Sequence, residues 1–183
     1  MSRVRRAVVG LGANLGDRRA TLDAATRKLA AIEETTLVTR SPLYETDPVG
    51  GPPQDVYLNA AVLLRTTLEA RDLLGRLLAI EASLGRVRDG TRDAPRTIDL
   101  DLLWMEGVVV SEDDVEVPHP RLGDRAFALV PLLDVAPDAP GSAMPRSWWG
   151  EGRPAIAGQF FFQNRRASSC RRPRRRCSWT RAA

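Results

Sequence analysis

Two hydrophobic periods alternate along the first 140 residues of the chain. Apolar, β-branched stretches predict strands at 4–12, 36–45, 57–65 and 97–104, and shorter extended segments at 108–110 and 115–118. Apolar residues at helical spacing, positions 22, 25, 29 and 32, predict a first helix. The leucines at 73, 74, 77, 78 and 84 predict a second, and a third is expected to run through Leu133.

Polar and turn residues mark where these elements begin and end. Asp17 is expected to cap the first helix, Thr66–Glu69 fits a capping box for the second, and Asp124 is expected to cap the third. Asp47–Asp55 contains three prolines and two glycines, which indicates a functional loop. Helices spaced among several strands with short connections predict an α+β sandwich whose sheet is largely antiparallel.

Charge and composition divide the chain near Pro140. Residues 141–183 contain ten Arg and one Glu, a balance of +9, so residues 1–140 carry −5 of the net +4. The tail also holds both cysteines and loses all hydrophobic periodicity. We therefore expect one domain over 1–140 and an Arg-rich tail over 141–183 that is disordered or read in a shifted frame.

The same composition excludes several classes of protein. The first 140 residues hold no cysteine and a single histidine, His119, which leaves no disulfide framework, zinc-finger set or two-histidine metal site there. No apolar run approaches the roughly 18 residues that a membrane helix needs. We expect a cytoplasmic monomer that binds no membrane, and a main domain that binds no nucleic acid, because the basic charge lies in the tail.

The pair Asp99 and Asp101 carries the strongest chemical signal. In a strand the two side chains project from one face, about 7 Å apart at Cα, while Ile98 and Leu100 point into the core. Neighbouring carboxylates on one face repel each other, and Mg²⁺ would offset that repulsion using carboxylate, phosphate and water oxygens. The alternative is the solvated outer face of an edge strand.

Arginines cluster beside this pair. Arg86, Arg88, Arg92 and Arg96 lie just upstream of it in the chain, and guanidinium groups bind phosphate oxygens in a bidentate fashion. Metal carboxylates next to such arginines indicate a polyphosphate site. A solvated basic loop neutralised by nearby aspartates is the competing interpretation.

Two weaker signals accompany the acidic pair. Tyr57 and Asn59 share a strand face, where a ring and an amide can stack on a planar heterocycle and pair with its edge. His119, held between two prolines, can donate to a phosphate. Exposed strand polarity and a structural turn histidine are the respective alternatives.

The glycine-rich stretch after the first predicted strand is not a dinucleotide fingerprint. In Gly10–Gly16 a leucine occupies the third glycine position of GxGxxG. The chain also lacks GxxxxGK[ST], and its only lysine is Lys28. A Rossmann or P-loop enzyme is therefore disfavoured.

Six motifs together resemble the 6-hydroxymethyl-7,8-dihydropterin pyrophosphokinase family. They occur in the family's order over about residues 4–138: GLGANLG (10–16), SPLYET (41–46), YLNAAV (57–62), GRVR (85–88), PRTIDLD (95–101) and VPHPR (117–121). The resemblance implies a ferredoxin-like fold and transfer of pyrophosphate from ATP to the pterin hydroxymethyl oxygen, with release of AMP. Asp93 and Pro120 replace aromatic residues of some relatives, so closure over the site is expected to differ.

The resemblance also assigns roles to residues. It implies that Asp99 and Asp101 bind two Mg²⁺ ions and form the catalytic set with Arg86 and Arg96. The implied pterin-binding residues are Thr46, Val49, Tyr57, Asn59 and Phe127. The implied ATP-binding residues are Glu81, Arg86, Arg88, Arg96, His119 and Arg125.

Two other functions compete with this one. A different Mg²⁺-dependent nucleotidyl or phosphoryl transferase would share the acidic pair without needing Tyr57, Asn59 and Phe127 together. A nucleic-acid-binding protein would act through the tail, and its salt-dependent binding would vanish on truncation after Pro140.

Overall fold

The computed structural model describes residues 3–87 and 94–139 and the short strand at 161–162. The strands are β1 (Arg5–Ala13), β2 (Thr35–Arg40), β3 (Tyr44–Thr46), β4 (Tyr57–Thr66), β5 (Asp99–Met105), β6 (Val110–Glu112), β7 (Val115–Val117) and β8 (Phe161–Phe162). The helices are α1 (Arg18–Ala30), α2 (Ala70–Ser83) and α3 (Ala126–Val135).

The main sheet is antiparallel throughout its described pairs and runs β5-β1-β4-β3-β8, with β2 also paired to β4. Strand β4 thus lies between β1 and the β2–β3 edge, and β1 lies between β4 and β5. This interleaving of two split β-α-β units is the ferredoxin-like arrangement. The predicted α+β sandwich with a largely antiparallel sheet is confirmed.

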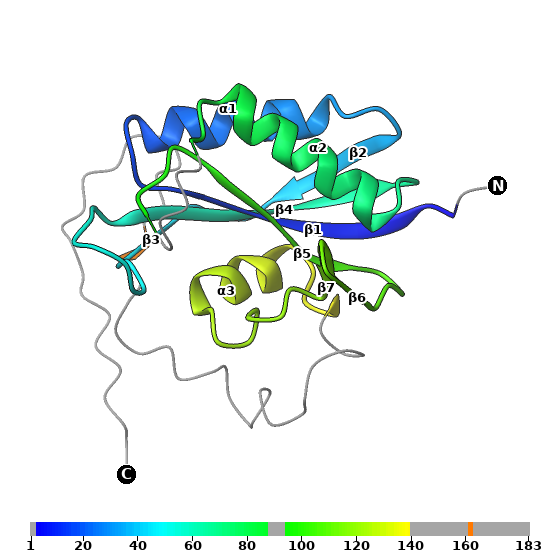
Figure 1. Cartoon of the computed structure of the whole chain (residues 1–183). Coiled ribbons are helices and arrows are strands. Elements are labelled where there is room, and N and C mark those ends of the chain that lie inside the picture. Colours follow the sequence, from blue (N-terminus) through cyan, green and yellow to red (C-terminus); the bar gives the residue numbers. More distant parts are fainter. Residues whose placement is uncertain (1–2, 88–93, 140–160, 163–183) are drawn as a thin grey trace, which may run out of the picture.

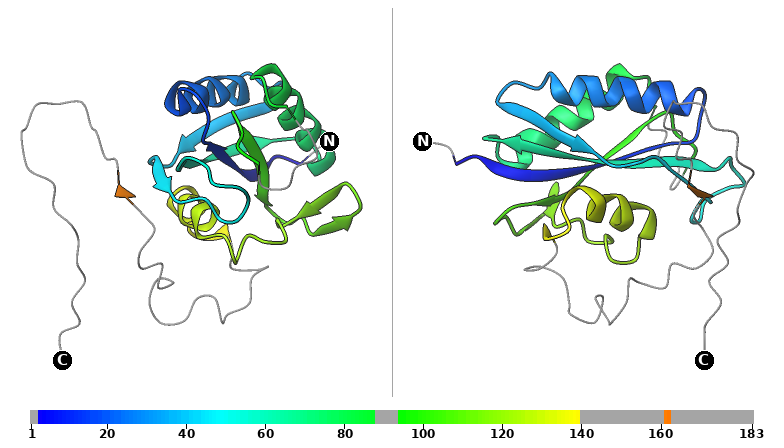
Figure 2. Two further views of the ribbon diagram at one scale, coloured as in Figure 1. Left: turned by 60° about the vertical axis from the view of Figure 1, so that its left-hand side comes forward. Right: turned by 180° about the vertical axis from the view of Figure 1, so that it is seen from behind.

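The sheet has two covered faces, and α1 and α2 pack on one of them (Figure 1). The larger apolar cluster lies beneath these two helices and includes Val9 and Leu11 of β1 and Leu100 of β5. Helix α3 packs on the opposite face, with a smaller cluster that includes Val8 and Leu103, and Figure 2 shows the sheet between the two helix layers. Because side chains alternate along each strand, Gly10, Gly12, Asp99 and Asp101 belong to the α3 face.

The predicted strand at 36–45 is two strands, because Ser41 and Pro42 interrupt it. The Ser41 Oγ accepts a bond from Ala61 N (2.9 Å), and Pro42 has no N–H to give to a ladder. Strands β2 and β3 therefore pair with opposite ends of β4. Thr46 is consequently brought beside Tyr57, its partner in the register.

Two predicted helix caps are wrong, whereas Asp17 does cap α1 by accepting from Ala20 N (3.0 Å). Helix α2 begins after Glu69, which makes no side-chain cap bond and instead accepts from Arg5. Thr66 is the last residue of β4, and its Oγ1 accepts from Leu68 N (3.1 Å). Helix α3 is preceded by Arg125 rather than Asp124, again without a side-chain cap bond.

The expected burial of the second helix is correct for Leu73 and Leu77 but wrong for Leu78, which is 44% exposed. Strand β5 begins at Asp99 rather than at Thr97, and β6 begins at Val110 rather than at Val108. None of the helices in the described part of the chain is both long and apolar enough to span a membrane. Of the predicted tail, only the pairing of β8 with β3 falls within the described residues.

Candidate active site at the uncovered end of the sheet

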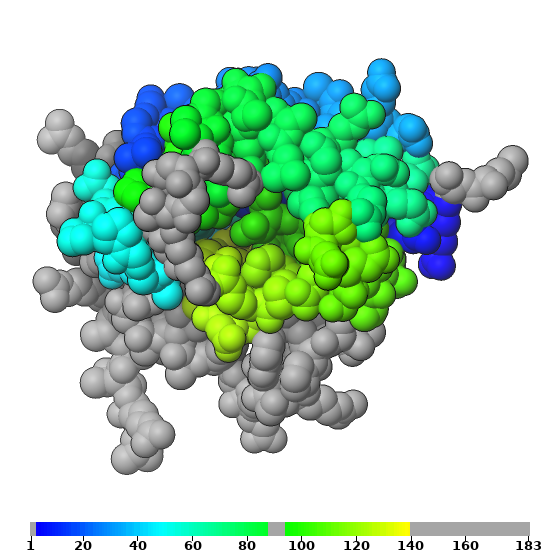
Figure 3. Space-filling view, in the orientation of Figure 1, coloured from blue at the N-terminus to red at the C-terminus, as the bar shows by residue number. Residues whose placement is uncertain are grey.

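The α3 face of the sheet is covered by the helix over only part of its length. Figure 3 shows a hollow between α2 and α3, with the segment that contains β5 deeper inside. Beyond α3 lies a cavity of about 210 Å³. Its lining residues are Gly12, Thr46, Asp47, Val49, Gln54, Tyr57, Asn59, Arg96, Asp99, Arg121, Asp124, Arg125 and Phe127.

A row of three residues across three strands forms the floor of this cavity. In the register Gly12 of β1 pairs with Asn59 of β4 on one side and with Asp99 of β5 on the other. Neighbouring strands lie about 4.8 Å apart, so Asn59 and Asp99 are about 10 Å apart at Cα. An amide and a carboxylate therefore face one cavity with a bare glycine between them.

Position 12 has no room for a side chain. A Cβ at this position would lie 2.9 Å from Asn59 Oδ1, closer than such contacts allow, and 3.9 Å from the Tyr57 ring and the Asp99 Cβ. The glycine pair that resembled a dinucleotide motif thus lies inside β1, and Gly12 makes room for the polar groups of its neighbours.

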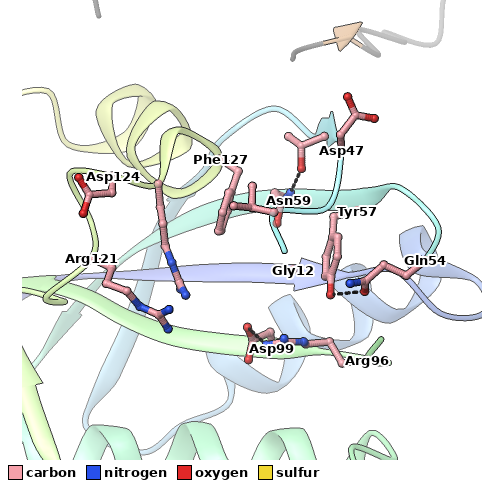
Figure 4. A pocket seen from close by; sticks show the side chains of 13 residues that line it. Gly12, Asp47, Gln54, Tyr57, Asn59, Arg96, Asp99, Arg121, Asp124 and Phe127 are labelled. Carbon is pink, nitrogen blue, oxygen red and sulfur yellow. Dashed lines mark hydrogen bonds and ion pairs between the residues drawn. The ribbon is translucent and has the colours of Figure 1, made fainter. Parts of the chain in front are cut away.

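Two aromatic side chains flank Asn59 in this cavity (Figure 4), Tyr57 from β4 and Phe127 from the first turn of α3. The Asn59 Nδ2 donates to Thr46 Oγ1 (2.7 Å), which fixes the amide with Oδ1 toward Gly12. The Tyr57 hydroxyl donates to Gln54 Oε1 (3.0 Å). Two rings around a buried, oriented amide suit a flat heterocycle with polar edges.

Asp99 is paired with two arginines. Its Oδ1 lies 2.5 Å from an Arg86 guanidinium nitrogen, and its Oδ2 lies 2.7 Å from an Arg96 nitrogen. The negative charge of Asp99 is therefore balanced by these two arginines, which reduces its repulsion of Asp101. The same guanidinium groups can exchange Asp99 for phosphate oxygens, since a carboxylate and a phosphate each offer two anionic oxygens to the paired N–H groups of an arginine.

Glu81 supports this arrangement from behind the strand. It is 2% exposed, its Oε1 accepts from Leu100 N (2.8 Å), and it lies 3.3 Å from the Arg86 guanidinium. Strand β5 is at the edge of the sheet, so the backbone N–H of Leu100, between Asp99 and Asp101, has no strand partner on that side among the residues that the structure describes. The Glu81 carboxylate accepts its hydrogen bond instead. Glu81 thereby fixes the positions of both β5 and Arg86.

Asp101 lacks the close arginine pairing of Asp99. The Asp101 side chain is 36% exposed, and its partial burial together with the neighbouring charge of Asp99 raises its pKa to about 6, although Arg125, 3.9 Å away, opposes the shift. Arg125 also lies over the Phe127 ring, 5.6 Å from its centroid. This arginine therefore connects the aromatic wall to the acidic pair.

His119 lies against β5, where its backbone N–H donates to Leu103 O (2.9 Å). Its Nδ1 accepts from Arg121 N (3.2 Å), so the neutral ring carries its proton on Nε2. Burial, and then the charges of Arg125 and Arg121, lower the pKa of His119 to about 4. The ring is therefore neutral near pH 7 and is a hydrogen-bond donor through Nε2.

The structure brings most of the sequence-predicted residues together. Those that line the cavity are Thr46, Val49, Tyr57, Asn59, Arg96, Asp99, Arg125 and Phe127. Arg86 and Glu81 lie behind Asp99, Asp101 lies near Arg125, and Arg88 is outside the described residues. The lining residues that the sequence argument missed are Gly12, Asp47, Gln54, Arg121 and Asp124.

The donor set fits a magnesium ion that is shared with a substrate. Within 3–87 and 94–139, no group of three or more His, Cys, Asp or Glu residues could enclose a metal. Asp99 and Asp101 supply hard carboxylate oxygens on one face, and Mg²⁺ commonly takes one or two carboxylates and completes its shell with phosphate and water. The protein alone thus provides a partial site of the kind that a nucleotide completes.

Comparisons with known proteins identify the family of the chain. A family model described as 7,8-dihydro-6-hydroxymethylpterin-pyrophosphokinase (HPPK) matches residues 8–137. The 2-amino-4-hydroxy-6-hydroxymethyldihydropteridine pyrophosphokinase of Methylorubrum extorquens is 48% identical over 133 residues, which cover 73% of this chain and 84% of that protein. The Pseudomonas aeruginosa protein of the same name is 43% identical over 135 residues, covering 74% and 83%.

Solved structures agree at the level of the fold. A crystal structure of HPPK-DHPS in complex with substrates matches with a TM-score of 0.62 at 15% identity, over 80% of this chain and 43% of that chain. HPPK-DHPS of Plasmodium falciparum matches with a TM-score of 0.58 at 13% identity, over 76% and 42%. This chain thus spans less than half of those solved chains. The family model and the curated relatives establish that the chain belongs to the 7,8-dihydro-6-hydroxymethylpterin-pyrophosphokinase family.

Proposed function

We propose that this cavity is where the chain carries out its family's reaction, the transfer of pyrophosphate from ATP to 6-hydroxymethyl-7,8-dihydropterin in folate synthesis. The observation that carries the proposal is the row Asn59–Gly12–Asp99. It sets an amide suited to a pterin edge and a carboxylate suited to a metal–phosphate group in one line. The substrate hydroxymethyl group would then lie between them.

The pterin would occupy the β4 side of the cavity. Tyr57 and Phe127 would stack on its ring, Asn59 and Thr46 would pair with its polar edge, and Val49, 63% exposed, would cover it from the loop. This placement leaves the hydroxymethyl oxygen pointing toward Asp99. A stacked, edge-paired ring loses the rotational freedom that would otherwise raise the barrier.

The triphosphate would occupy the β5 side. Arg86, Arg96, Arg125 and His119 would bind its oxygens, and Asp99 and Asp101 would hold two magnesium ions. Bound magnesium would neutralise the phosphate charge that opposes attack. The hydroxymethyl oxygen would form its bond to the β-phosphorus as the bond from that phosphorus to the AMP oxygen breaks, and the hydroxyl proton would be released to solvent. In-line positioning is therefore the main task of the protein.

Arg88 and Glu81 complete the proposed ATP-binding set. Arg88 follows Arg86 by two residues but lies outside the described residues. Glu81 would act on ATP through Arg86, because its carboxylate is already committed to Arg86 and Leu100 N. Product analysis tests the whole assignment, since formation of AMP rather than ADP separates pyrophosphoryl from phosphoryl transfer.

Replacing Gly12 with Ala tests the pterin half of the site. The added methyl would displace the Asn59 amide, so we expect pterin affinity to fall at least about tenfold, or 1.4 kcal/mol, with little change in the affinity for an ATP analogue. Fluorescence titration of each ligand measures the two affinities. Gly75→Ala is the control, because a Cβ there meets nothing within 4 Å. Equal pterin affinity in Gly12→Ala and wild type would remove Asn59 from the pterin site.

The neutral state of His119 leads to a pH prediction. Its folded-state pKa of about 4 lies below the ordinary 6.5, so its contribution to the free energy of unfolding is complete above pH 6.5 and is lost as the pH falls toward 4. His119→Gln should therefore flatten the stability profile between pH 6.5 and 4, while retaining more activity at pH 8 than His119→Ala because Gln still donates. Urea unfolding across this range measures the slope. An unchanged slope would show that the imidazole is not held neutral.

We further propose that residues 1–140 form the catalytic domain, that 141–183 are dispensable, and that the protein is a cytoplasmic monomer. The family model ends at residue 137, before the Arg-rich tail begins, which supports this division. Truncation after Pro140 should preserve most of the activity and shift the melting temperature by less than about 2 °C, well under the shift that a loss of 1 kcal/mol produces. A loss of about 10 °C, or aggregation, would show that the tail belongs to the fold.

A further inference from the structure

We infer that Asn14 is a positioning residue that ties the pterin side of the cavity to the phosphate side. This inference rests on the proposed function and adds a residue that none of the site assignments includes. Asn14 follows β1 directly and is 2% exposed. It holds two separate segments of the active site with one buried amide.

On the phosphate side, Asn14 pairs with the backbone of Arg96 in both directions. Its backbone N–H donates to Arg96 O (3.1 Å), and its Oδ1 accepts from Arg96 N (2.8 Å). The last regular pair between β1 and β5 is Gly12 with Asp99, so this closed ring extends the ladder beyond the ends of the strands. The Asn14 side-chain oxygen takes the place of a backbone carbonyl of a neighbouring strand. It thereby fixes the backbone position from which the Arg96 side chain extends.

On the pterin side, the same amide holds the end of the loop that covers the cavity. The Asn14 Nδ2 donates to Asp55 O (3.2 Å) and to Gln54 Oε1 (2.8 Å). Gln54 Oε1 also accepts from the Tyr57 hydroxyl. A chain of hydrogen bonds thus leads from the proposed pterin-stacking ring to the proposed phosphate-binding arginine, and Asn14 is its central member.

The orientation of this amide is fixed by its partners. Arg96 N can only donate and Asp55 O can only accept, so Oδ1 and Nδ2 cannot be exchanged. An aspartate at position 14 would keep the bond from Arg96 N but turn the donating nitrogen into an oxygen facing Asp55 O. A leucine would have similar size and would lose all three side-chain bonds. Asn14→Asp therefore disturbs only the bonds on the pterin side, whereas Asn14→Leu removes the side-chain bonds on both sides.

The experiment measures ligand affinity and stability separately in Asn14→Asp and Asn14→Leu. Titrations with the dihydropterin and with a non-hydrolysable ATP analogue are run in Mg²⁺ at least 15 °C below each variant's melting temperature. We expect Asn14→Asp to weaken pterin binding at least tenfold and analogue binding less than threefold. Asn14→Leu should weaken both, with a fall in kcat larger than either rise in KM.

Thr66→Val is the matched control. Thr66 is 1% exposed, lies at the far end of β4, and also bonds a backbone N–H beyond its strand. This variant should lose stability without any change in ligand affinity. If Asn14→Leu does not fold, Asn14→Asp is compared with Asn14→Ser instead. The shorter serine side chain removes the bonds on both the pterin side and the phosphate side and introduces no charge.

Unchanged affinities and kcat in the folded Asn14 variants, with only a lower melting temperature, would overturn the inference and leave Asn14 a purely structural residue. That result differs from failure of the proposed function. In the latter case the wild-type protein itself would bind neither ligand and form no AMP.

Discussion

Asp101→Asn should abolish pyrophosphoryl transfer and, in the absence of metal, make the protein more stable. Asp101 lies on the same face of β5 as Asp99, 3.9 Å from Arg125, and its raised pKa of about 6 means that its charged form is disfavoured in the fold. Removing that charge relieves the repulsion from Asp99 but deletes a proposed magnesium ligand. We expect the rate of AMP formation to fall at least about a hundredfold, or 2.7 kcal/mol of barrier.

The stabilisation has a predictable pH dependence. The folded-state pKa of Asp101 lies above the ordinary 3.8, so the wild-type penalty is complete above pH 6 and fades as the pH falls toward 4 and the carboxylate is protonated. Melting in EDTA should therefore show a higher melting temperature for Asp101→Asn at pH 7.5 and a smaller difference at pH 4.5. Retention of more than about a hundredth of the wild-type rate, or a lower melting temperature at pH 7.5, would contradict this assignment.

Asp99→Asn is the informative comparison. It should lose activity to a similar extent but should also lose stability, because Arg86 and Arg96 would keep their charges without their shared counter-ion. Opposite signs of the stability change at two neighbouring aspartates distinguish their environments. A merely solvated strand face predicts no change at either position.

Arg96→Lys should lower kcat at least about tenfold, or 1.4 kcal/mol, while pterin affinity changes little. Arg96 reaches Asp99 Oδ2 at 2.7 Å and lines the cavity, so its guanidinium is placed to exchange a carboxylate for a phosphate. Lysine keeps the charge but loses the planar fork. Steady-state kinetics at saturating ATP measure the effect.

Arg76→Lys, in the middle of α2, is the control for a general effect of the arginine-to-lysine change. A wild-type kcat for Arg96→Lys at saturating ATP would show that bidentate phosphate binding is not its role. A loss of pterin affinity as large as the loss of kcat would instead place Arg96 in the pterin half of the site.

The acidic pair was predictable from sequence because it depends only on strand alternation. Asp99 and Asp101 had to share a face once Ile98 and Leu100 were assigned to the core, and the structure buries both apolar residues. The pairing of Tyr57 with Asn59 followed from the same periodicity. The alternation of side chains along one strand therefore predicts which residues of that strand face the site.

Residues that depend on register between strands were not predictable in this way. Gly12 joins the site because β1 pairs with β4 and β5 at one position, and no local pattern states that pairing. Asp99 was expected to bind metal and the nearby arginines to bind phosphate, whereas Arg86 and Arg96 pair directly with Asp99. Asp124, which was predicted to cap α3, lines the cavity instead.

The fate of the β-phosphorus tests the central claim most directly. The wild-type protein is incubated with Mg²⁺, 6-hydroxymethyl-7,8-dihydropterin and ATP labelled at the β-phosphorus, and the products are separated. Pyrophosphoryl transfer predicts that the label moves to the pterin, with one AMP formed for each labelled pterin. Label that stays in ADP, or ATP consumption that does not require the pterin, would contradict the account.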